Sequence, residues 1–248
     1  MGNTEKNKFG LVGKNISYSF SKGYFTQKFI TLGLNEHTYD NFDLVQIEDF
    51  QKLINQNKDL KGLNVTIPYK EAIIPYLDEL NPKAKKIGAV NTVKFTKKGL
   101  KGYNTDIYGF KRSIIPFLKK HHNRALILGT GGASKAVAFV FGELGLDFKY
   151  VSRRPVGNQF SYMDLNEKIL DKYTILVNCT PLGTFPNIEE KPDIPYQFIQ
   201  DKHLLFDLIY NPEKTAFLQE GEKQGASICN GHKMLELQAE KAWKIWNS

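Results

Sequence analysis

Residues 125–134 read Ala-Leu-Ile-Leu-Gly-Thr-Gly-Gly-Ala-Ser and are the most informative segment for the fold. The apolar start is typical of a buried strand, and the glycines lead into a segment with helical spacing up to Leu144. Glycines at such a turn let a pyrophosphate approach the amides at the helix N-terminus. The pattern predicts a dinucleotide-binding unit, with an ordinary strand-to-helix turn as the alternative. The residues assigned to this cofactor loop are Gly129, Gly131, Gly132, Ala133 and Ser134.

The next expected strand, residues 148–151, ends in Ser152-Arg153-Arg154. In dinucleotide-binding units an acidic residue at this place binds the ribose 2′-hydroxyl of NAD, whereas arginine accommodates the 2′-phosphate of NADP. Two guanidinium groups without a carboxylate between them favour a phosphate dianion through charge-assisted hydrogen bonds. The sequence therefore predicts NADP(H) as the cofactor, held in part by Ser152, Arg153 and Arg154. A pair of solvated loop arginines is the alternative.

Strand-like and helical runs alternate on both sides of the glycine loop. The runs that read as strands are residues 9–12, 38–42, 62–67 and 92–95 before the loop and residues 148–151, 175–178 and 204–208 after it. Parallel strands with crossover helices suit these lengths. We predict the α/β class with two α/β domains: an N-terminal substrate domain, residues 1–105, and a Rossmann-like NADP-binding domain, residues 106–231.

The C-terminal segment, residues 232–248, has the pattern of a helix. Leu235, Ala239, Ala242 and Trp246 fall on one face, and Gln238 falls on the same face. A buried amide requires hydrogen-bond partners, so Gln238 either contacts backbone groups or points into a polar cleft. We favour the cleft and expect this helix to pack back on the N-terminal domain.

Composition excludes several classes of function. The chain has 248 residues and a net charge of +8, but its lysines are scattered and no nucleic-acid-binding motif accompanies them. No apolar run approaches the roughly 20 residues of a membrane-spanning helix, and the N-terminus lacks a signal-peptide pattern. Neither the two cysteines nor the histidines have metal-ligand spacing. We expect a cytoplasmic protein with no metal, no membrane segment and no nucleic-acid partner.

Two ionisable residues stand where apolar runs end. In Asn-Val-Thr-Ile-Pro-Tyr-Lys, residues 64–70, Lys70 comes two residues after Pro68, and proline is favoured at the first position of a helix. The dipole of such a helix would disfavour the charged ammonium, which suits a lysine that exchanges a proton; a surface lysine is the alternative. Asp106 precedes an apolar-periodic helix as an N-cap or first-turn residue, and a carboxylate beside Lys70 would relay its proton.

Several motifs agree in order and spacing, from Phe9 to about Trp246, with one family of enzymes. The motifs are Gly13-x-x-Ile16-x-x-Ser19-x-Ser21, Asn64-Val-Thr-Ile-Pro-Tyr-Lys70, Gly88-Ala-Val-Asn91-Thr92, Gly102-x-Asn104-Thr105-Asp106-x-x-Gly109, the Gly129 loop, Asn178-Cys-Thr-Pro-Leu-Gly183, Asp207-Leu-Ile-Tyr210-x-Pro212-x-x-Thr215 and Gly231-x-x-Met234-Leu235-x-x-Gln238-Ala239. In these motifs the chain resembles the shikimate dehydrogenases.

The resemblance implies reversible NADPH-dependent reduction of 3-dehydroshikimate to shikimate in aromatic amino acid (chorismate) biosynthesis, with Lys70 and Asp106 as the proton-transferring pair. By the same resemblance, the ring hydroxyls of the substrate would be bound by Asn64, Thr66, Asn91 and Gln238. The substrate carboxylate would be bound by Ser19, Ser21 and Tyr210. Further cofactor contacts would come from Thr180, Gly183, Leu208 and Gly231.

Four residues depart from the family pattern, namely Tyr18, Lys22, Ser152 and Thr184. They bear on the carboxylate-binding loop and on the cofactor loops, and the proposed catalytic pair is unchanged. The enzymatic alternative is a quinate/shikimate dehydrogenase with a broader substrate or cofactor range; the two arginines after the second strand count against NAD. The alternative from another class is a non-catalytic sensor of NADP or shikimate. For the oligomeric state, a monomer and a homodimer are both compatible with the sequence.

Overall fold

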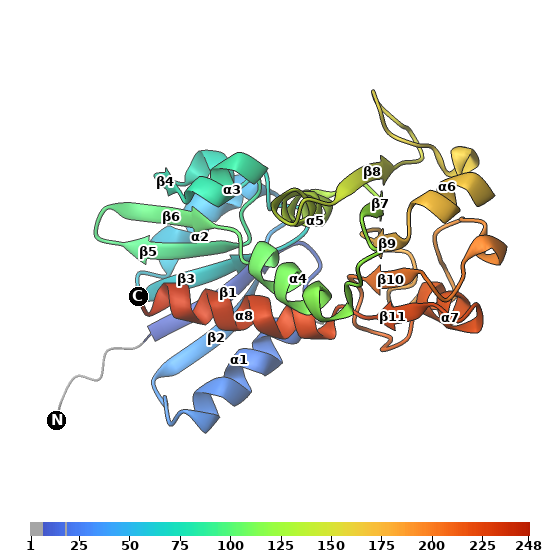
Figure 1. Ribbon diagram of the computed structural model, residues 1–248. Coiled ribbons are helices and arrows are strands. Elements are labelled where there is room, and N and C mark those ends of the chain that lie inside the picture. The colour runs from blue at the N-terminus through green and yellow to red at the C-terminus, as the bar shows by residue number, and fades with distance from the viewer. Residues whose placement is uncertain (1–6, 18) are drawn as a thin grey trace. The chain divides into compact units, whose positions relative to one another are not determined.

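The computed structural model describes residues 7–17 and 19–248, so Tyr18 lies outside the described residues. The chain forms two compact units, each built on its own sheet, and the predicted α/β class is confirmed (Figure 1). The first unit takes in the described residues up to Thr105 together with Ala239–Ser248, and the second is Asp106–Gln238. The functional domain bounds expected from the sequence stay predictions.

The first unit contains a six-stranded sheet in the order β2-β1-β3-β5-β6-β4. Its elements are β1 (Asn7–Gly13), α1 (Phe20–Thr31), β2 (His37–Asp43), α2 (Phe50–Gln56), β3 (Leu60–Val65), β4 (Glu79–Leu80), α3 (Pro82–Ile87), β5 (Thr92–Thr96) and β6 (Gly99–Tyr103), with short 3-10 turns at Ile47–Asp49 and Ile74–Tyr76. Strands β1, β2 and β3 are parallel, whereas β5 is antiparallel to both β3 and β6. The parallel pairing that the run lengths suit therefore covers only part of this sheet.

The antiparallel pair follows from a short connection. Only Lys97 and Lys98 separate β5 from β6, whereas a parallel crossover needs a dozen or more residues. Gly99 completes the hairpin with φ of +112°, a conformation that residues with a Cβ rarely adopt. The sheet is mixed because the chain turns back at once.

Two apolar cores cover the two faces of the first sheet. On one face Phe9 of β1 packs with Phe25 of α1 and with Trp246 of α8 (His232–Trp246). Gly62 of β3 faces the same indole ring, and an added Cβ would lie 2.3 Å from it. The Trp246 Nε1 group donates to the carbonyl of Val93 at 3.0 Å. The end of the C-terminal helix therefore packs on the N-terminal sheet, as predicted.

The second unit contains a five-stranded parallel sheet in the order β11-β10-β9-β7-β8. Its elements are α4 (Asp106–Ile114), a 3-10 turn (Ile115–Phe117), β7 (Arg124–Leu128), α5 (Gly132–Glu143), β8 (Asp147–Val151), α6 (Glu167–Lys172), β9 (Ile175–Asn178), β10 (Leu204–Asp207), α7 (Ala216–Lys223) and β11 (Ser227–Cys229), with further 3-10 turns at Tyr162–Asp164 and Tyr196–Phe198. Because β8 and β9 lie on opposite sides of β7, the strand order reverses between β7 and β9. Ligands of doubly wound sheets bind at such a point.

Helices cover both faces of this second sheet. Phe110 of α4 makes edge contacts with Phe141 of α5 and Phe206 of β10, at ring-centroid distances of 5.5 and 5.1 Å. On the other face Leu170 of α6 and Phe217 of α7 belong to one buried cluster. Burial on both faces explains why the strands read as continuous apolar runs. Among the described residues, none of the helices is long and apolar enough to cross a membrane.

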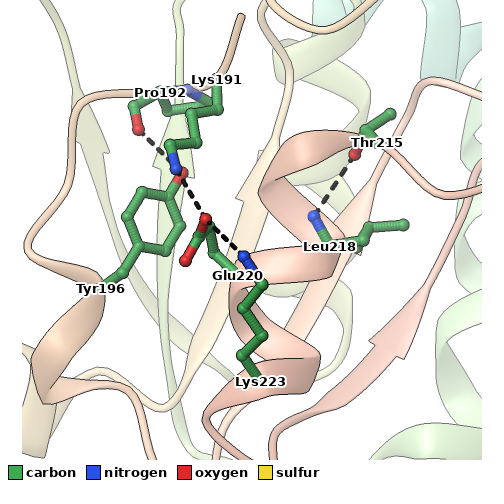
Figure 2. Close-up of polar contacts among 7 residues, drawn as sticks. All are labelled: Lys191, Pro192, Tyr196, Thr215, Leu218, Glu220 and Lys223. Atoms are coloured by element: carbon green, nitrogen blue, oxygen red, sulfur yellow. Dashed lines mark hydrogen bonds and ion pairs between the residues drawn. The ribbon is translucent and has the colours of Figure 1, made fainter. Parts of the chain in front are cut away.

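Polar contacts fasten the loop before β10 to α7. Figure 2 shows Glu220 of α7 accepting from Lys191 at 2.9 Å and from Lys223 at 3.2 Å. The Tyr196 hydroxyl donates to the carbonyl of Pro192 at 2.8 Å. These bonds hold the proline-containing segment before β10 in place.

Candidate active site

The predicted substrate residues of the first unit gather at one edge of its sheet. Strands β1 and β3 are parallel, so the loops that leave Gly13 and Val65 leave the same edge. The first of these loops ends at Ser19 and leads into α1, whose first turn holds Ser21, and the second loop carries Thr66 and Lys70. On the antiparallel side Thr92 pairs with both Asn64 and Tyr103, which brings the neighbouring residues to this edge as well.

The serine loop is fixed by a helix cap and by an acidic residue. Ser19 is the N-cap of α1, and its Oγ accepts a hydrogen bond from the amide of Ser21 at 3.2 Å. The carboxylate of Asp43, at the end of β2, accepts from the amides of Asn15 at 2.9 Å and Ile16 at 3.3 Å. Asp43 was not singled out from the sequence, because its partners lie 27 or more residues away.

Asn64 lies in a buried chain of neutral hydrogen bonds. Its Oδ1 accepts from the Tyr39 hydroxyl at 2.8 Å, and its Nδ2 donates to the Asn91 carbonyl and to the Thr92 hydroxyl, both at 3.3 Å. Tyr39 is 3% exposed, and the other members of the chain are buried too. A predicted substrate residue, Asn64, is therefore held from behind by a buried tyrosine.

The same chain of bonds fixes Asn91. Its Oδ1 accepts from the Thr105 amide at 2.7 Å and from the hydroxyls of Thr105 and Thr92 at 3.1 Å each. Three protein donors therefore fix the direction of this oxygen. Thr92 and Thr105 were quoted in motifs but not assigned to the site. We call the group Tyr39, Asn64, Asn91, Thr92 and Thr105 the neutral network.

Lys70 does not lie in a helix, and the predicted helix start at Pro68 is wrong. Residues 66–73 form consecutive turns, with the Tyr69 amide donating to Thr66 and the Ile73 amide to Tyr69, at 2.9 Å each. Pro75 explains the difference, because proline has no amide hydrogen and cannot continue a helix begun seven residues earlier. Lys70 is therefore not exposed to the dipole of a helix that begins at Pro68. Its carbonyl accepts from the amide of Val90 at 2.7 Å.

In the second unit, Asp106 is the first residue of α4 and is buried, as its place before a helix predicted. Gly109 follows one turn later at the crossing of α4 and α8. An added Cβ there would lie 2.5 Å from the Met234 carbonyl and 3.2 Å from Cβ of Gln238. Gln238 is itself buried. The close approach of the two helices therefore explains why this motif contains a glycine.

The cofactor loop has the geometry that its glycines predicted. Gly129 has φ of +100°, and an added Cβ would lie 3.0 Å from Cγ2 of Thr180, another predicted cofactor residue. Gly131 is the N-cap of α5, and an added Cβ there would meet no atom within 4 Å. The space beside the first amides of α5 is open, which suits a pyrophosphate. The loop therefore fits the predicted dinucleotide.

Ser134 serves the shape of this loop. Its side chain is fully buried, and its Oγ donates to the Gly131 carbonyl at 2.6 Å. Its amide donates to the same carbonyl at 3.0 Å. Both donors of Ser134 are therefore engaged within the loop, so its side chain closes the turn.

The loop after β8 presents the two arginines. Ser152 donates its amide to the Phe160 carbonyl at 2.9 Å, and its Oγ accepts from the Arg154 amide at 3.2 Å. This turn leaves the side chains of Arg153 and Arg154 exposed. Exposed guanidinium groups at the carboxyl end of the second strand of the unit are suited to a 2′-phosphate.

A second buried polar group lies at the ends of β9 and β10. Asp207 is fully buried and accepts from the Thr215 hydroxyl at 2.6 Å, the Ile209 amide at 3.0 Å and Nδ2 of Asn178 at 3.1 Å. Loss of hydration on burial nevertheless raises the pKa of Asp207 to about 6. Thr215 also caps α7 by accepting from the Leu218 amide at 3.4 Å (Figure 2). We call Asn178, Asp207 and Thr215 the acidic network.

The acidic network holds the loops that carry further predicted cofactor residues. Oδ1 of Asn178 accepts from the Thr180 amide at 3.0 Å and from its hydroxyl at 2.6 Å. An added Cβ on Gly231 would lie 2.1 Å from the Leu208 carbonyl, so these two residues are in contact. Gly183 has φ of +95° and Tyr210 is partly exposed. Asp207 and Thr215 were quoted in a motif, but nothing in that motif indicates that they bond to each other.

A cavity of about 970 Å³ lies elsewhere in the second unit, beside α4, α7, β11 and the start of α8. It is lined by apolar side chains and by Arg112, Lys214 and Lys233, together with Glu213. Lys214 and Lys233 are paired with Glu222 and Glu236 at 2.8 and 3.0 Å. None of the predicted site residues lines this cavity, and carboxylates already neutralise two of its cations.

The two sheets and their carboxyl edges define a class of protein. A parallel sheet with a glycine loop at its switch point and exposed arginines after its second strand is typical of a dinucleotide-dependent dehydrogenase. The other sheet offers an edge lined with buried amides and hydroxyls, which suits a polyhydroxylated ligand.

Comparison with known proteins gives the family. A family model described as the shikimate dehydrogenase substrate binding domain matches residues 11–93. The shikimate dehydrogenase (NADP(+)) of Clostridium botulinum is 39% identical over 252 residues, which cover 96% of this chain and 95% of that protein. The chain belongs to the shikimate dehydrogenase family, and the resemblance inferred from its motifs is confirmed.

Solved structures agree in fold over the same length. A shikimate dehydrogenase from Peptoclostridium difficile has 36% identity and a TM-score of 0.83, covering 97% of this chain and 92% of that one. The shikimate 5-dehydrogenase from Thermus thermophilus, solved in complex with NADP(H) and shikimate, has 30% identity and a TM-score of 0.85. The match covers 96% of this chain and 92% of the Thermus chain.

Proposed function

We propose that this protein is an NADP-dependent oxidoreductase that interconverts shikimate and 3-dehydroshikimate. The observation that carries the proposal is the neutral network at the carboxyl edge of the first sheet. It lines a binding edge with amide and hydroxyl groups and lies beside the loops of Ser19 and Lys70. Such an edge suits a ring that carries several hydroxyls and one carboxylate. Family membership supports both the reaction and the cofactor.

In the proposed reaction Lys70 and Asp106 form the proton-transferring pair. When shikimate is oxidised, the ring carbon loses a hydride and its hydroxyl loses a proton, which Lys70 accepts and Asp106 helps to relay. NADP(+), when bound, takes up the hydride. Reduction of the ketone returns the hydride to the ring carbon and the proton to its oxygen, so the same residues serve either direction.

The remaining predicted residues hold the two ligands. In the substrate half, Asn64, Thr66, Asn91 and Gln238 bind ring hydroxyls, and Ser19, Ser21 and Tyr210 bind the carboxylate. In the cofactor half, the pyrophosphate lies at Gly129, Gly131, Gly132 and Ala133, with Ser134 shaping their loop. The 2′-phosphate lies at Ser152, Arg153 and Arg154, and the nicotinamide end lies near Thr180, Gly183, Leu208 and Gly231.

The first test is the initial rate of nicotinamide reduction with purified protein, measured by absorbance. Shikimate and quinate are each paired with NADP and with NAD. Turnover confined largely to shikimate with NADP is expected. Comparable rates with quinate or NAD would instead place the protein among the broader quinate/shikimate dehydrogenases. Binding of shikimate without turnover in any pairing would favour a sensor.

The second test is Lys70→Ala. Proton transfer acts mainly in the transition state, so kcat is expected to fall by about 10²–10⁴-fold while the KM for shikimate changes little. Lys97→Ala, in the exposed hairpin between β5 and β6, is the matched control and should keep the wild-type rate. An unchanged kcat in Lys70→Ala would show that Lys70 does not take part in the proton transfer.

A further inference from the structure

The Tyr39 hydroxyl lies behind a residue that the proposed function assigns to the substrate. It donates to Oδ1 of Asn64 at 2.8 Å, and Asn64 is assigned to a ring hydroxyl. One buried phenol group therefore supports a proposed substrate contact directly.

The Tyr39 side chain is held rigidly. Its ring stacks on Phe25 of α1 with a centroid distance of 4.6 Å and an interplanar angle of 10°. Trp246 packs nearby at 6.5 Å, and only 3% of Tyr39 is exposed. Burial raises the pKa of Tyr39 far above its ordinary value, so the hydroxyl keeps its proton throughout the physiological range. It is a permanent hydrogen-bond donor.

This donor selects one orientation of the Asn64 carboxamide. With Oδ1 toward Tyr39, Nδ2 reaches the Asn91 carbonyl at 3.3 Å. The reversed amide would place Oδ1 against that carbonyl, acceptor against acceptor. A carboxamide oxygen has two lone pairs, so accepting from Tyr39 does not exhaust Oδ1 of Asn64. A ring hydroxyl that binds there would meet an oxygen of fixed direction.

We propose that Tyr39 is a positioning residue, which holds Asn64 in place for the shikimate ring without touching the ring itself. The proposal rests on the proposed function. It assigns a role in substrate recognition to a residue that otherwise belongs to the aromatic core between β2 and α1. A core role requires only the ring of Tyr39, whereas the positioning role requires its hydroxyl.

Tyr39→Phe separates these roles, because it keeps the ring and removes the donor. Oδ1 of Asn64 then loses its protein donor, and we expect the KM for shikimate to rise about tenfold. The kcat should stay within about threefold and the KM for NADP within about twofold, since neither the proton transfer nor the cofactor loop is touched. Tyr196→Phe is the matched control: it also removes a phenol that donates to a buried acceptor, at 2.8 Å, but in the second unit. It should leave the KM for shikimate unchanged.

A double-mutant cycle with Asn64→Ala tests whether Tyr39 acts through Asn64. In the Asn64→Ala background, Tyr39→Phe should change the KM by less than about twofold, because its target is gone. Calorimetric titration of shikimate without cofactor should show the same pattern in Kd. Equal tenfold effects in both backgrounds, or an unchanged KM in the single variant, would overturn the proposal.

Wild-type rates keep this test separate from the proposed function. If the wild type fails to oxidise shikimate, the proposed function fails. If the wild type is active and Tyr39→Phe has the same KM for shikimate as the wild type, only the positioning role fails. Thermal unfolding of both tyrosine variants shows whether a changed KM reflects loss of fold, since a merely structural role would lower Tm and leave the KM of the folded enzyme unaltered.

Discussion

The neutral network and the acidic network occupy equivalent places in their units. Both hold side chains in place where strands end, the first with uncharged groups and the second around a carboxylate. Each lies where neighbouring strands end, at Asn64 of β3 in the first unit and at Asn178 and Asp207 in the second. In the first network every donor and acceptor is uncharged. In the second, three donors surround the carboxylate of Asp207, which has no exposed surface.

The two networks show what a buried charge adds to a fold and what it costs. Three hydrogen bonds lower the pKa of Asp207, but desolvation outweighs them and leaves that pKa at about 6. The neutral network orients side chains without this penalty. A carboxylate accepts in several directions at once, and Asp207 uses this to tie β9, β10 and the start of α7 together. The second unit therefore gains a rigid anchor, and its stability becomes dependent on pH.

The largest expected effect comes from removing the anchor. Asp207→Ala leaves the Thr215 hydroxyl, the Ile209 amide and the Asn178 amide buried without their acceptor. The free energy of unfolding should fall by about 3–5 kcal/mol at pH 5, where Asp207 is mostly protonated and removal of its charge brings little relief. Urea denaturation measures this. Asp147→Ala, an exposed aspartate of the same unit, should change the value little; a similar loss there would contradict the anchor role.

The second effect concerns pH. The folded-state pKa of Asp207, about 6, lies above its ordinary value of 3.8, so the folded state keeps a proton that the unfolded chain releases. Stability therefore falls as pH rises from about 4 through 6, and above that range the buried charge costs about 3 kcal/mol. Asp207→Asn keeps an acceptor oxygen and carries no charge. The stability of wild type relative to this variant should fall by that amount between pH 4 and pH 8.

The control for this pH effect is the shape of the two curves of unfolding free energy against pH, one for wild type and one for Asp207→Asn. Other titrating groups are common to both proteins and cancel in the difference between them. Parallel curves for wild type and Asp207→Asn from pH 4 to 8 would show that Asp207 is ionised normally in the fold. The acidic network would then be no different in kind from the neutral one.

The reverse exchange introduces a charge into the neutral network. In Asn64→Asp one oxygen can still accept from Tyr39, but the other faces the Asn91 carbonyl, which can only accept. The protonated acid is favoured there, so stability should fall as pH rises above 4, by about 2 kcal/mol at pH 7. Urea denaturation at both pH values measures it. Asn55→Asp, on the exposed surface of α2, should show no such dependence; if the two variants behave alike, burial is not the cause.

Much of the fold was predictable because its signals are local. The strands of the second sheet are short apolar runs bounded by glycine or polar residues, and α8 begins and ends where its apolar face predicted. Strand β6 was missed, since Gly-Leu-Lys-Gly-Tyr contains two glycines and a lysine and lacks a clear alternation. It is a strand because a two-residue turn sets it beside β5. Its state depends on pairing, which the residues alone do not encode.

Site residues could be proposed where a residue type has a specific chemistry. Gly129 and the two arginines after β8 were selected because phosphate recognition requires such residues at those places. Tyr39 gave no signal, since a tyrosine in an apolar strand reads as core and its partner is 25 residues away. Lys70 was placed wrongly because Pro68 favours a helix start, while Pro75 prevents the helix from continuing. The preference for a helix at Pro68 was therefore overridden by the residues that follow it.

The smallest expected effect tests whether charge recognition belongs to the second unit alone. Arg153→Ala should raise the KM for NADP about 10–30-fold and the KM for NAD less than about threefold, because only NADP carries the 2′-phosphate that the guanidinium would bind. The wild-type KM for NADP should also rise with salt, since the two arginines are exposed and their charges are screened. The KM for shikimate should respond less, because its proposed partners at the neutral network are uncharged. Equal losses for NADP and NAD in Arg153→Ala would show that Arg153 does not contact the 2′-phosphate, and the contrast between the two edges would then rest on Asp207 alone.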